Sequence, residues 1–187
     1  MRKLTIVVCI LALAAVALSG CGSRAGSSVP EPTGVARETT ETSVFYSTGR
    51  SLFEERTVVD AKNPYLAALD VLLAAQPKTD KNLAIVQPQA KVNSVAVKDG
   101  IATVDWAPAV LSFNAEPKEK MLALASVLRT LGEFPEVKRV RFTVDGKTGG
   151  TVGGKDIESF WGSVSLKGQP WDVLRAAPAS KETSTTQ

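Results

Sequence analysis

The chain has 187 residues, 44% of them hydrophobic, and a formal charge of +3, which is typical of a globular domain rather than a disordered protein. Beyond the basic residues at positions 2 and 3, 20 basic residues balance 19 acidic ones without a Lys or Arg run, so no nucleic-acid partner is expected. It has no histidine, and its only cysteines are Cys9 and Cys21. The sequence after Cys21 therefore has neither the histidine nor the cysteine that Ser-His catalysis, Cys-His catalysis and Cys/His zinc sites require. We expect no cofactor and no metal.

The N-terminus has the pattern of a lipoprotein signal peptide. A basic start precedes an apolar run over residues 4–18, and Leu18-Ser19-Gly20-Cys21 resembles the lipobox of bacterial lipoprotein precursors. The small residues before the cysteine admit the signal peptidase. We expect residues 1–20 to be removed, and fatty acyl chains such as palmitate on Cys21 to hold the protein on the extracytoplasmic face of the cell membrane. The alternative is an uncleaved membrane helix, which leaves the remainder on the same side.

Composition divides the remaining chain into three parts. Residues 21–42 are rich in Gly, Ser, Thr, Pro and Glu and almost free of apolar side chains, which predicts a flexible tether. Residues 176–187 are polar and are predicted to be a disordered tail. The folded domain is expected between them, over residues 43–175.

The first elements predicted in this domain are two strands and a helix. Ser43–Thr48 and Leu52–Val59 have strand composition, with a Gly-Arg turn between them. Asn63-Pro64 is typical of a helix start, with Asn as N-cap and proline in the first turn. Leucines then recur at helical spacing until Gln76-Pro77, where the helix is predicted to end.

The second half predicts a hairpin, a helix and two strands. Lys91–Trp106 alternates apolar and polar residues around Asp99-Gly100, a tight-turn dipeptide. A helix is predicted over residues 116–132, a strand over Val137–Asp145, and a last strand over Gly162–Leu166. The predicted buried stripe of this helix consists of Met121, Leu124, Ala125, Leu128 and Leu131.

These elements predict an α+β fold. Two amphipathic helices need one apolar sheet face to cover, so the expected architecture is a two-layer sandwich with a mixed sheet and both helices on one face. No internal repeat is present to suggest a second domain of the same kind.

Four segments of the chain resemble the GerMN domain of spore germination and sporulation lipoproteins, in order and in spacing. They are Val44–Ser47, Asn63–Ala75, Ser94–Asp105 and Leu131–Lys147, which span most of residues 43–147. Family members often close with a Gly-His pair that leads a strand, whereas this chain has Gly162-Ser163. Many members also carry two such domains or an added module, and this chain has one.

The resemblance implies a scaffolding role rather than catalysis. GerMN domains are similar to the ring-building motifs of multi-protein secretion complexes, and family members are linked to envelope channels of sporulating cells or to a membrane sensor. The partners expected are therefore envelope proteins or further copies of the chain, bound through a strand edge or the sheet face that the helices leave uncovered. The alternative is a module that binds a cell-wall fragment or another small ligand.

Two patterns invite a catalytic or nucleotide-binding interpretation. Residues 149–155 have the glycine and lysine spacing of a phosphate-binding loop, but Asp156 replaces the Ser or Thr that holds magnesium, so a flexible connector is expected. Glu54 and Glu55 are sequence neighbours and point to opposite faces of a strand. Asp99 and Asp145 each precede a glycine and are interpreted as turn residues, so no catalytic residue is assigned.

The tryptophans are the remaining candidates for a binding surface. Trp106 continues the alternating face of a strand and is assigned to the core. Trp161 and Trp171 flank the last predicted segment, where they either pin it to the domain or face a partner, because tryptophan is common in both settings.

Overall fold

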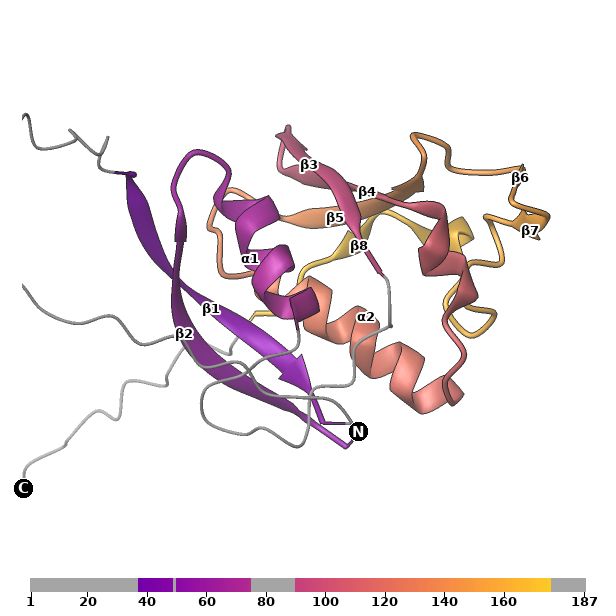
Figure 1. Cartoon of the computed structure of the whole chain (residues 1–187), viewed down its shortest axis with the longest axis horizontal. Coiled ribbons are helices and arrows are strands. Elements are labelled where there is room, and N and C mark those ends of the chain that lie inside the picture. Colours follow the sequence, from indigo (N-terminus) through magenta and orange to yellow (C-terminus); the bar gives the residue numbers. More distant parts are fainter. Residues whose placement is uncertain (1–36, 49, 75–89, 176–187) are drawn as a thin grey trace, which may run out of the picture. The chain divides into compact units, whose positions relative to one another are not determined.

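The computed structural model describes residues 37–48, 50–74 and 90–175 (Figure 1). The signal peptide, the lipobox Leu18-Ser19-Gly20-Cys21, most of the predicted tether and the predicted tail lie outside these residues. The predicted helix end at Gln76-Pro77 lies outside them as well.

The first two strands form a long antiparallel hairpin, and no other strand in the described part of the chain pairs with it. β1 is Thr39–Ser47 and β2 is Leu52–Asp60, and they pair residue for residue from one end to the other. β1 begins inside the segment that composition predicts as tether. The threonines at positions 39, 40 and 42 favour an extended strand once β2 is available to pair with them. The folded part therefore begins at least four residues before Ser43.

Both predicted helices form, and their first turns follow the sequence signals. α1 is Pro64–Ala74, and the amide N–H of Leu66 donates to the side chain of Asn63 at 3.2 Å. α2 is Pro117–Leu131, and its Glu119 carboxylate accepts from the N–H of Glu116 at 3.1 Å. Three residues of the predicted stripe of α2, Leu124, Leu128 and Leu131, are buried, whereas Met121 is 48% exposed.

The main sheet has four strands in the order β3-β4-β5-β8. They are β3 (Val92–Lys98), β4 (Ile101–Trp106), β5 (Arg139–Val144) and β8 (Trp171–Asp172). β4 and β5 are parallel, and the other neighbours are antiparallel, so the sheet is mixed as predicted. Asp99 and Gly100 both have positive φ, +50° and +76°, as the two-residue turn between β3 and β4 requires.

A bulge explains the irregular spacing of valines in β3. Val92 and Val95 are three residues apart, yet both are buried against the core. The register shifts between Val92 and Ser94, which adds one residue and returns both valines to the same face.

The core lies on one face of the main sheet and continues through the helices to the hairpin. α1 contacts β1, β2, β3 and α2, while α2 contacts β1 and β2, so the helices link the hairpin to the sheet (Figure 1). The α+β class is as predicted, but the five long strands lie in two separate sheets rather than one. The inner face of the main sheet contributes Ala102, Val104, Trp106, Val140, Phe142 and Val144, all at most 2% exposed.

The region after β5 differs from the sequence prediction. Residues 149–155, predicted as a connector, include most of a small hairpin of β6 (Thr151–Val152) and β7 (Lys155–Asp156). Gly162–Leu166 is not a strand, because positive φ at Phe160 (+41°) and Gly162 (+76°) turns the chain there. Two short 3₁₀ helices, η1 (Pro108–Ser112) and η2 (Leu166–Gly168), complete the described elements. Neither described helix is long and apolar enough to cross a bilayer.

Candidate functional site

The two long edges of β1 are occupied in different ways. Toward β2, the pairing begins before the strand, where the N–H of Ala61 donates to the carbonyl of Glu38 at 2.9 Å. Backbone groups of an antiparallel strand point to alternate sides at successive residues. The even-numbered residues of β1 therefore bond to β2, and the odd-numbered residues point their N–H and C=O groups to the opposite edge. Glu41, Ser43 and Phe45 lie on that outer edge.

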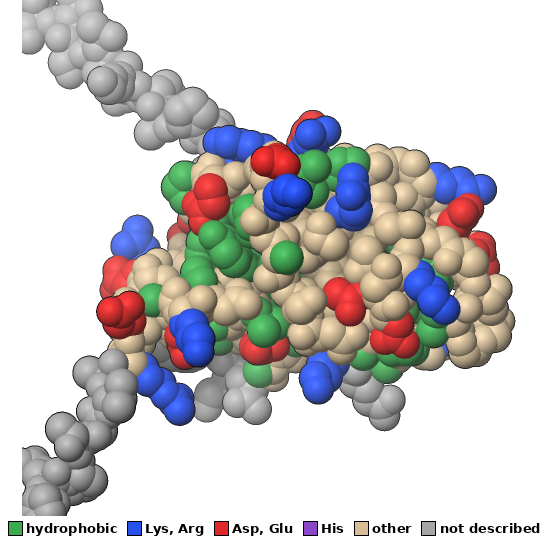
Figure 2. Space-filling model, turned by 90° about the horizontal axis from the view of Figure 1, so that it is seen from above, with side chains coloured by type: hydrophobic (Ala, Val, Ile, Leu, Met, Phe, Trp, Pro, Cys, Tyr) green, Lys and Arg blue, Asp and Glu red, His purple; other side chains and the backbone are tan. Residues whose placement is uncertain are grey.

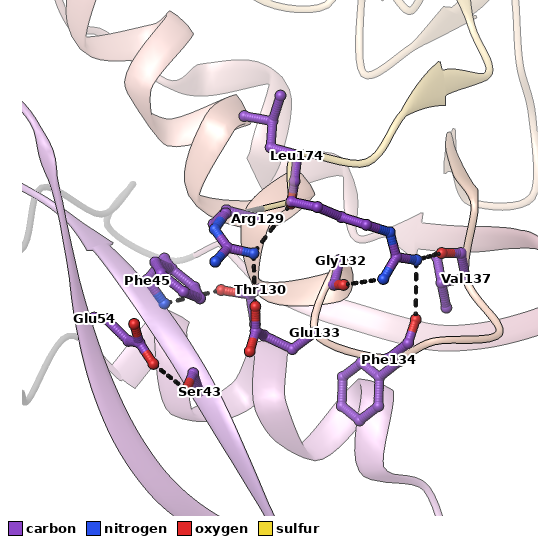
Figure 3. A network of polar contacts seen from close by, with 11 residues as sticks. Ser43, Phe45, Glu54, Arg129, Thr130, Gly132, Glu133, Phe134, Val137 and Leu174 are labelled. Atoms are coloured by element: carbon purple, nitrogen blue, oxygen red, sulfur yellow. Dashed lines mark hydrogen bonds and ion pairs between the residues drawn. The ribbon is translucent and has the colours of Figure 1, made fainter. Parts of the chain in front are cut away.

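Helix α2 closes the outer edge of β1 at Phe45 (Figure 3). The N–H of Phe45 donates to the hydroxyl of Thr130 at 3.0 Å, and Thr130 is fully buried. The guanidinium carbon of Arg129 lies 4.2 Å from the centroid of the Phe45 ring, a cation–π contact, and Arg129 also forms an ion pair with Glu133 at 2.6 Å. A partner strand has no room to pair with Phe45.

Toward the start of β1 the same edge lies open in a groove of about 350 Å³. One wall is formed by β1 over Thr40–Ser43 and by Arg56 of β2, and the other by Glu133, Phe134 and Pro135. Within the described part of the chain, no hydrogen bond satisfies the outward N–H and C=O groups of Glu41 and Ser43. The groove therefore exposes a strand edge that water or a ligand must satisfy.

The far wall of the groove is fixed by the end of the described chain. The guanidinium of Arg175 donates to the carbonyls of Gly132 at 2.8 Å and Phe134 at 3.4 Å, and to that of Val137 (Figure 3). A Cβ at Gly132 would lie 2.4 Å from the carbonyl oxygen of Leu174, so only glycine permits this approach. The turn after α2 is thus held by hydrogen bonds from Arg175 as well as through its own packing.

The charges around the groove are only partly matched. The Glu133 carboxylate is engaged by Arg129, and the Glu54 carboxylate accepts from the Ser43 hydroxyl at 2.6 Å. Glu41 and Arg56 are exposed and have no ion-pair partner among the described residues. Because the walls are mainly polar and offer backbone groups at regular spacing, the groove is suited to an extended polar chain rather than to an apolar ligand.

The two predicted tryptophans do not come together at a binding surface. Trp161 is only 7% exposed, its indole N–H donates to the carbonyl of Val110 at 2.8 Å, and its ring packs 5.0 Å from Phe113. Trp171 is half-buried, and its ring centroid lies 5.2 Å from that of Phe142. Of the two alternatives, pinning of the C-terminal segment fits both positions. A partner contact at Trp161 is disfavoured, because its ring packs against the core.

The carboxylates singled out in the sequence have local partners. Glu55 is buried and Glu54 is exposed, so they point apart as predicted, and Asp99 and Asp145 sit at positive φ in turns. Burial alone would raise the pKa of Asp105. Hydrogen bonds to it from Thr143 (2.6 Å), the Gly146 N–H (2.7 Å) and Asn93 (3.0 Å) together lower that pKa below its usual value.

Lys155 is also committed to the fold. Its ammonium donates to the carbonyl of Leu111 at 3.2 Å and to the hydroxyl of Ser112 at 3.0 Å. The glycine-rich segment is therefore a hairpin fastened to η1, and its lysine does not point into a phosphate cradle.

Comparison with known proteins places the chain in a family. A sequence model of the Germane family, described as sporulation and spore germination, matches residues 28–150. The chain belongs to this family. Both walls of the groove, from β1 to Pro135, lie within the matched residues, whereas Arg175 lies beyond them.

Two of the similar solved structures are GerMN domains by title, and a third is a candidate lipoprotein. The tandem GerMN domains of the sporulation protein GerM from Bacillus subtilis are 25% identical over 67% of this chain, with a TM-score of 0.44, and the chain spans only 44% of that structure. The first GerMN domain of GerM is 18% identical over 63% of this chain and 93% of its own, with a TM-score of 0.49. A candidate lipoprotein from Clostridium perfringens is 18% identical over 68% of this chain and 84% of its own, with a TM-score of 0.44. No curated protein matches the chain.

Proposed function

We propose that this Germane-family protein is a lipid-anchored envelope protein whose GerMN domain docks on protein partners, without catalysing a reaction, during sporulation or germination. The family relation to sporulation and germination is given by the match over residues 28–150. The anchor is supported by the lipobox that ends at Cys21.

The observation that carries the docking role is the groove along β1. An unpaired strand edge is a template for a second chain, and folded proteins usually cover or charge such edges. In this domain the edge is left open over Glu41 and Ser43 and is flanked by a rigid wall. A site of this shape supports recognition of a polypeptide better than it supports chemistry on a small substrate.

A second surface is available on the main sheet. The face opposite the core carries small or polar side chains at its centre, including Ser94, Ala96 and Thr103. Lys and Arg side chains are interspersed with Asp and Glu side chains over the face seen in Figure 2, with no continuous field of one sign. Such a mixed surface supports protein contacts more than binding to a polyanion.

The proposal is tested in cells that express the full chain at native abundance. Wild type and Cys21→Ala are compared by fatty-acid labelling, by recovery in washed membranes and by reversible crosslinking. We expect labelling, membrane retention and crosslinked envelope proteins for wild type, and loss of labelling for Cys21→Ala. A monomeric wild-type protein without crosslinked species would contradict the docking role, and unlabelled wild type would contradict the anchor.

A small ligand from the cell wall is the second candidate. The groove volume of about 350 Å³ falls within the range of small-molecule sites, although its walls are polar and open. A ligand that binds only the folded state must raise the melting temperature. Thermal-shift measurements with soluble wall fragments therefore separate the two candidates.

A further inference from the structure

We propose that the groove binds one extended segment of a protein partner as an additional strand on β1, and that this segment carries a Lys or Arg opposite Glu41. This inference rests on the docking role proposed above and names the chemistry of the partner. It is carried by three features of the groove: the backbone groups it leaves open, the fixed wall opposite β1 and the charge it leaves unmatched.

The open backbone groups have the spacing of a strand. Glu41 and Ser43 lie two residues apart, and both point an N–H and a C=O away from β2. Antiparallel strands exchange pairs of hydrogen bonds at every second residue, so an incoming segment can form roughly four backbone hydrogen bonds here. The pairing stops at Phe45, whose N–H is already donated to Thr130. The site therefore accepts a short extended segment rather than a long sheet.

The wall opposite β1 is already in place. The groove of about 350 Å³ separates β1 from the turn formed by Glu133, Phe134 and Pro135, and a segment paired with β1 would lie in it about 4.8 Å from that strand. Arg175 and Arg129 hold that turn, so the wall of the groove does not need to become ordered when a segment binds. Phe134 and Pro135 offer the apolar part of the wall to one side chain of the segment.

The charges give the segment a preferred residue. Side chains directly opposite each other on paired strands interact, and opposite charges there are favourable. Glu41 has no ion-pair partner among the described residues, and Glu133 of the far wall is engaged by Arg129. Arg56 lies opposite Ser43 in β2. A basic side chain is therefore favoured at the Glu41 end of the groove and disfavoured at the Ser43 end.

The test uses the full chain in detergent micelles and blocked seven-residue peptides of alternating Thr and Val with a central Lys, Ser or Glu. Binding is followed by fluorescence anisotropy, and the bound position by amide hydrogen exchange. Two variants form a matched pair. Ser43→Ala removes the hydroxyl that reaches Glu54 but keeps the N–H, whereas Ser43→Pro removes both. Proline at position 43 removes no hydrogen bond of the β1–β2 hairpin, because the Ser43 N–H does not pair with β2.

We expect the Lys peptide to bind wild type and Ser43→Ala equally, and Ser43→Pro at least about tenfold more weakly, with slower exchange of the Glu41 and Ser43 amides. Glu41→Lys should reverse the preference from the Lys peptide to the Glu peptide, and added salt should reduce both preferences. If Ser43→Pro fails to fold, a Lys peptide N-methylated on its bonding edge replaces it and should bind at least about tenfold more weakly to wild type.

Equal binding to Ser43→Pro, protection of other amides, or no binding of any peptide would overturn the proposal. Dimerisation of the chain through the same amides would overturn it too, because the groove would then take a second copy. The outcome is separable from the docking role: if Ser43→Pro retains its crosslinked envelope partners in cells, the partners use another surface and only the strand-addition site is wrong.

Discussion

The outer edges of β5 and β1 both present backbone N–H and C=O groups that need hydrogen-bond partners, and the two edges are closed to different extents. Beside β5, β8 pairs with Arg139 and Val140, and the side-chain amide of Gln169 then bonds both the N–H of Phe142 (2.7 Å) and its carbonyl (2.9 Å). Beside β1, Thr130 bonds only the N–H of Phe45. An amide supplies donor and acceptor together and so imitates a neighbouring strand, whereas the Thr130 hydroxyl closes a single group.

The more fully closed edge is also the more tightly packed one. The Phe142 ring lies 5.4 Å from that of Trp106, 5.7 Å from Phe160 and 5.2 Å from Trp171, in the middle of the aromatic core. The first residues of β1, by contrast, are exposed or half-buried. The closed edge therefore belongs to the part that holds the fold together, and the open edge to a part that the fold can leave free for binding.

The largest expected effect is at the closed edge. Phe142→Ala should lower the free energy of unfolding by about 3–5 kcal/mol, because it leaves a cavity among three aromatic rings. Val58→Ala on β2, where the side chain is 55% exposed, should change it by less than about 0.5 kcal/mol. Urea denaturation measures both. A smaller loss for Phe142→Ala than for Val58→Ala would refute the assignment of the main core to β5.

The next effect concerns the hydrogen bond by which α2 closes β1 at Phe45. Thr130→Val keeps the shape of the side chain but leaves the Phe45 N–H buried without an acceptor, so we expect a loss of about 1–3 kcal/mol. Ser126 lies one turn earlier on α2 and is also buried, but its hydroxyl has no hydrogen-bond partner among the residues that the structure describes. Ser126→Ala should therefore cost nothing or stabilise. Equal losses in the two variants would show that the Thr130–Phe45 hydrogen bond contributes little.

A weaker effect is expected when the amide that completes the β5 edge is removed. Gln169→Ala leaves the N–H and C=O of Phe142 without their partner. Because Gln169 is half-buried, water can replace its amide, so we expect the free energy of unfolding to fall by only about 1–2 kcal/mol. Lys167→Ala is the control, since its ion pair with Glu158 is exposed. Amide exchange at Phe142 should accelerate in Gln169→Ala alone, and unchanged exchange there would count against the role assigned to Gln169.

Local signals were sufficient for the elements that position both edges. The Asn63-Pro64 pair begins α1, and Asp99-Gly100 forms the tight turn between β3 and β4, because each acts through neighbouring backbone groups. The strand predicted over Val137–Asp145 contains β5, whose alternating Val140, Phe142 and Val144 all point into the core. These predictions need only the period of the element and the chemistry of its ends.

The groove could not be predicted, because it depends on contacts between residues far apart in the sequence. Threonines and glutamates before Ser43 have the composition of a tether, and only pairing with β2 makes them a strand. Arg175 fixes the wall of the groove from more than 35 positions away in sequence, through carbonyl groups that any residue would offer. The last strand was misplaced for a related reason, since β8 is defined by its pairing with β5 rather than by its own two residues.

The smallest expected effect is a pH dependence of the free energy of unfolding, which arises in the main sheet and not at the edge of β1. Asp105 links three parts of the main sheet, since it accepts hydrogen bonds from Asn93 of β3, Thr143 of β5 and the Gly146 N–H of the turn beyond. These bonds lower its pKa, so the folded chain holds the proton less tightly than the unfolded chain, whose Asp pKa is about 3.9. The stabilisation is therefore present above about pH 4 and is lost as the pH falls through the lower folded pKa.

Asp105→Asn should lower the free energy of unfolding by about 1 kcal/mol at pH 7, because the amide can no longer accept all three bonds. The difference from wild type should shrink as the pH falls below about 4, since the unfolded wild-type chain then takes up a proton that the folded chain binds only at lower pH. Thr130→Val serves as the reference from the other region: its loss involves no titrating group and should stay constant over the same range. Stability curves from urea denaturation between pH 3 and 7 measure both. A constant difference for Asp105→Asn would mean that its charge does not hold β3, β4 and β5 together.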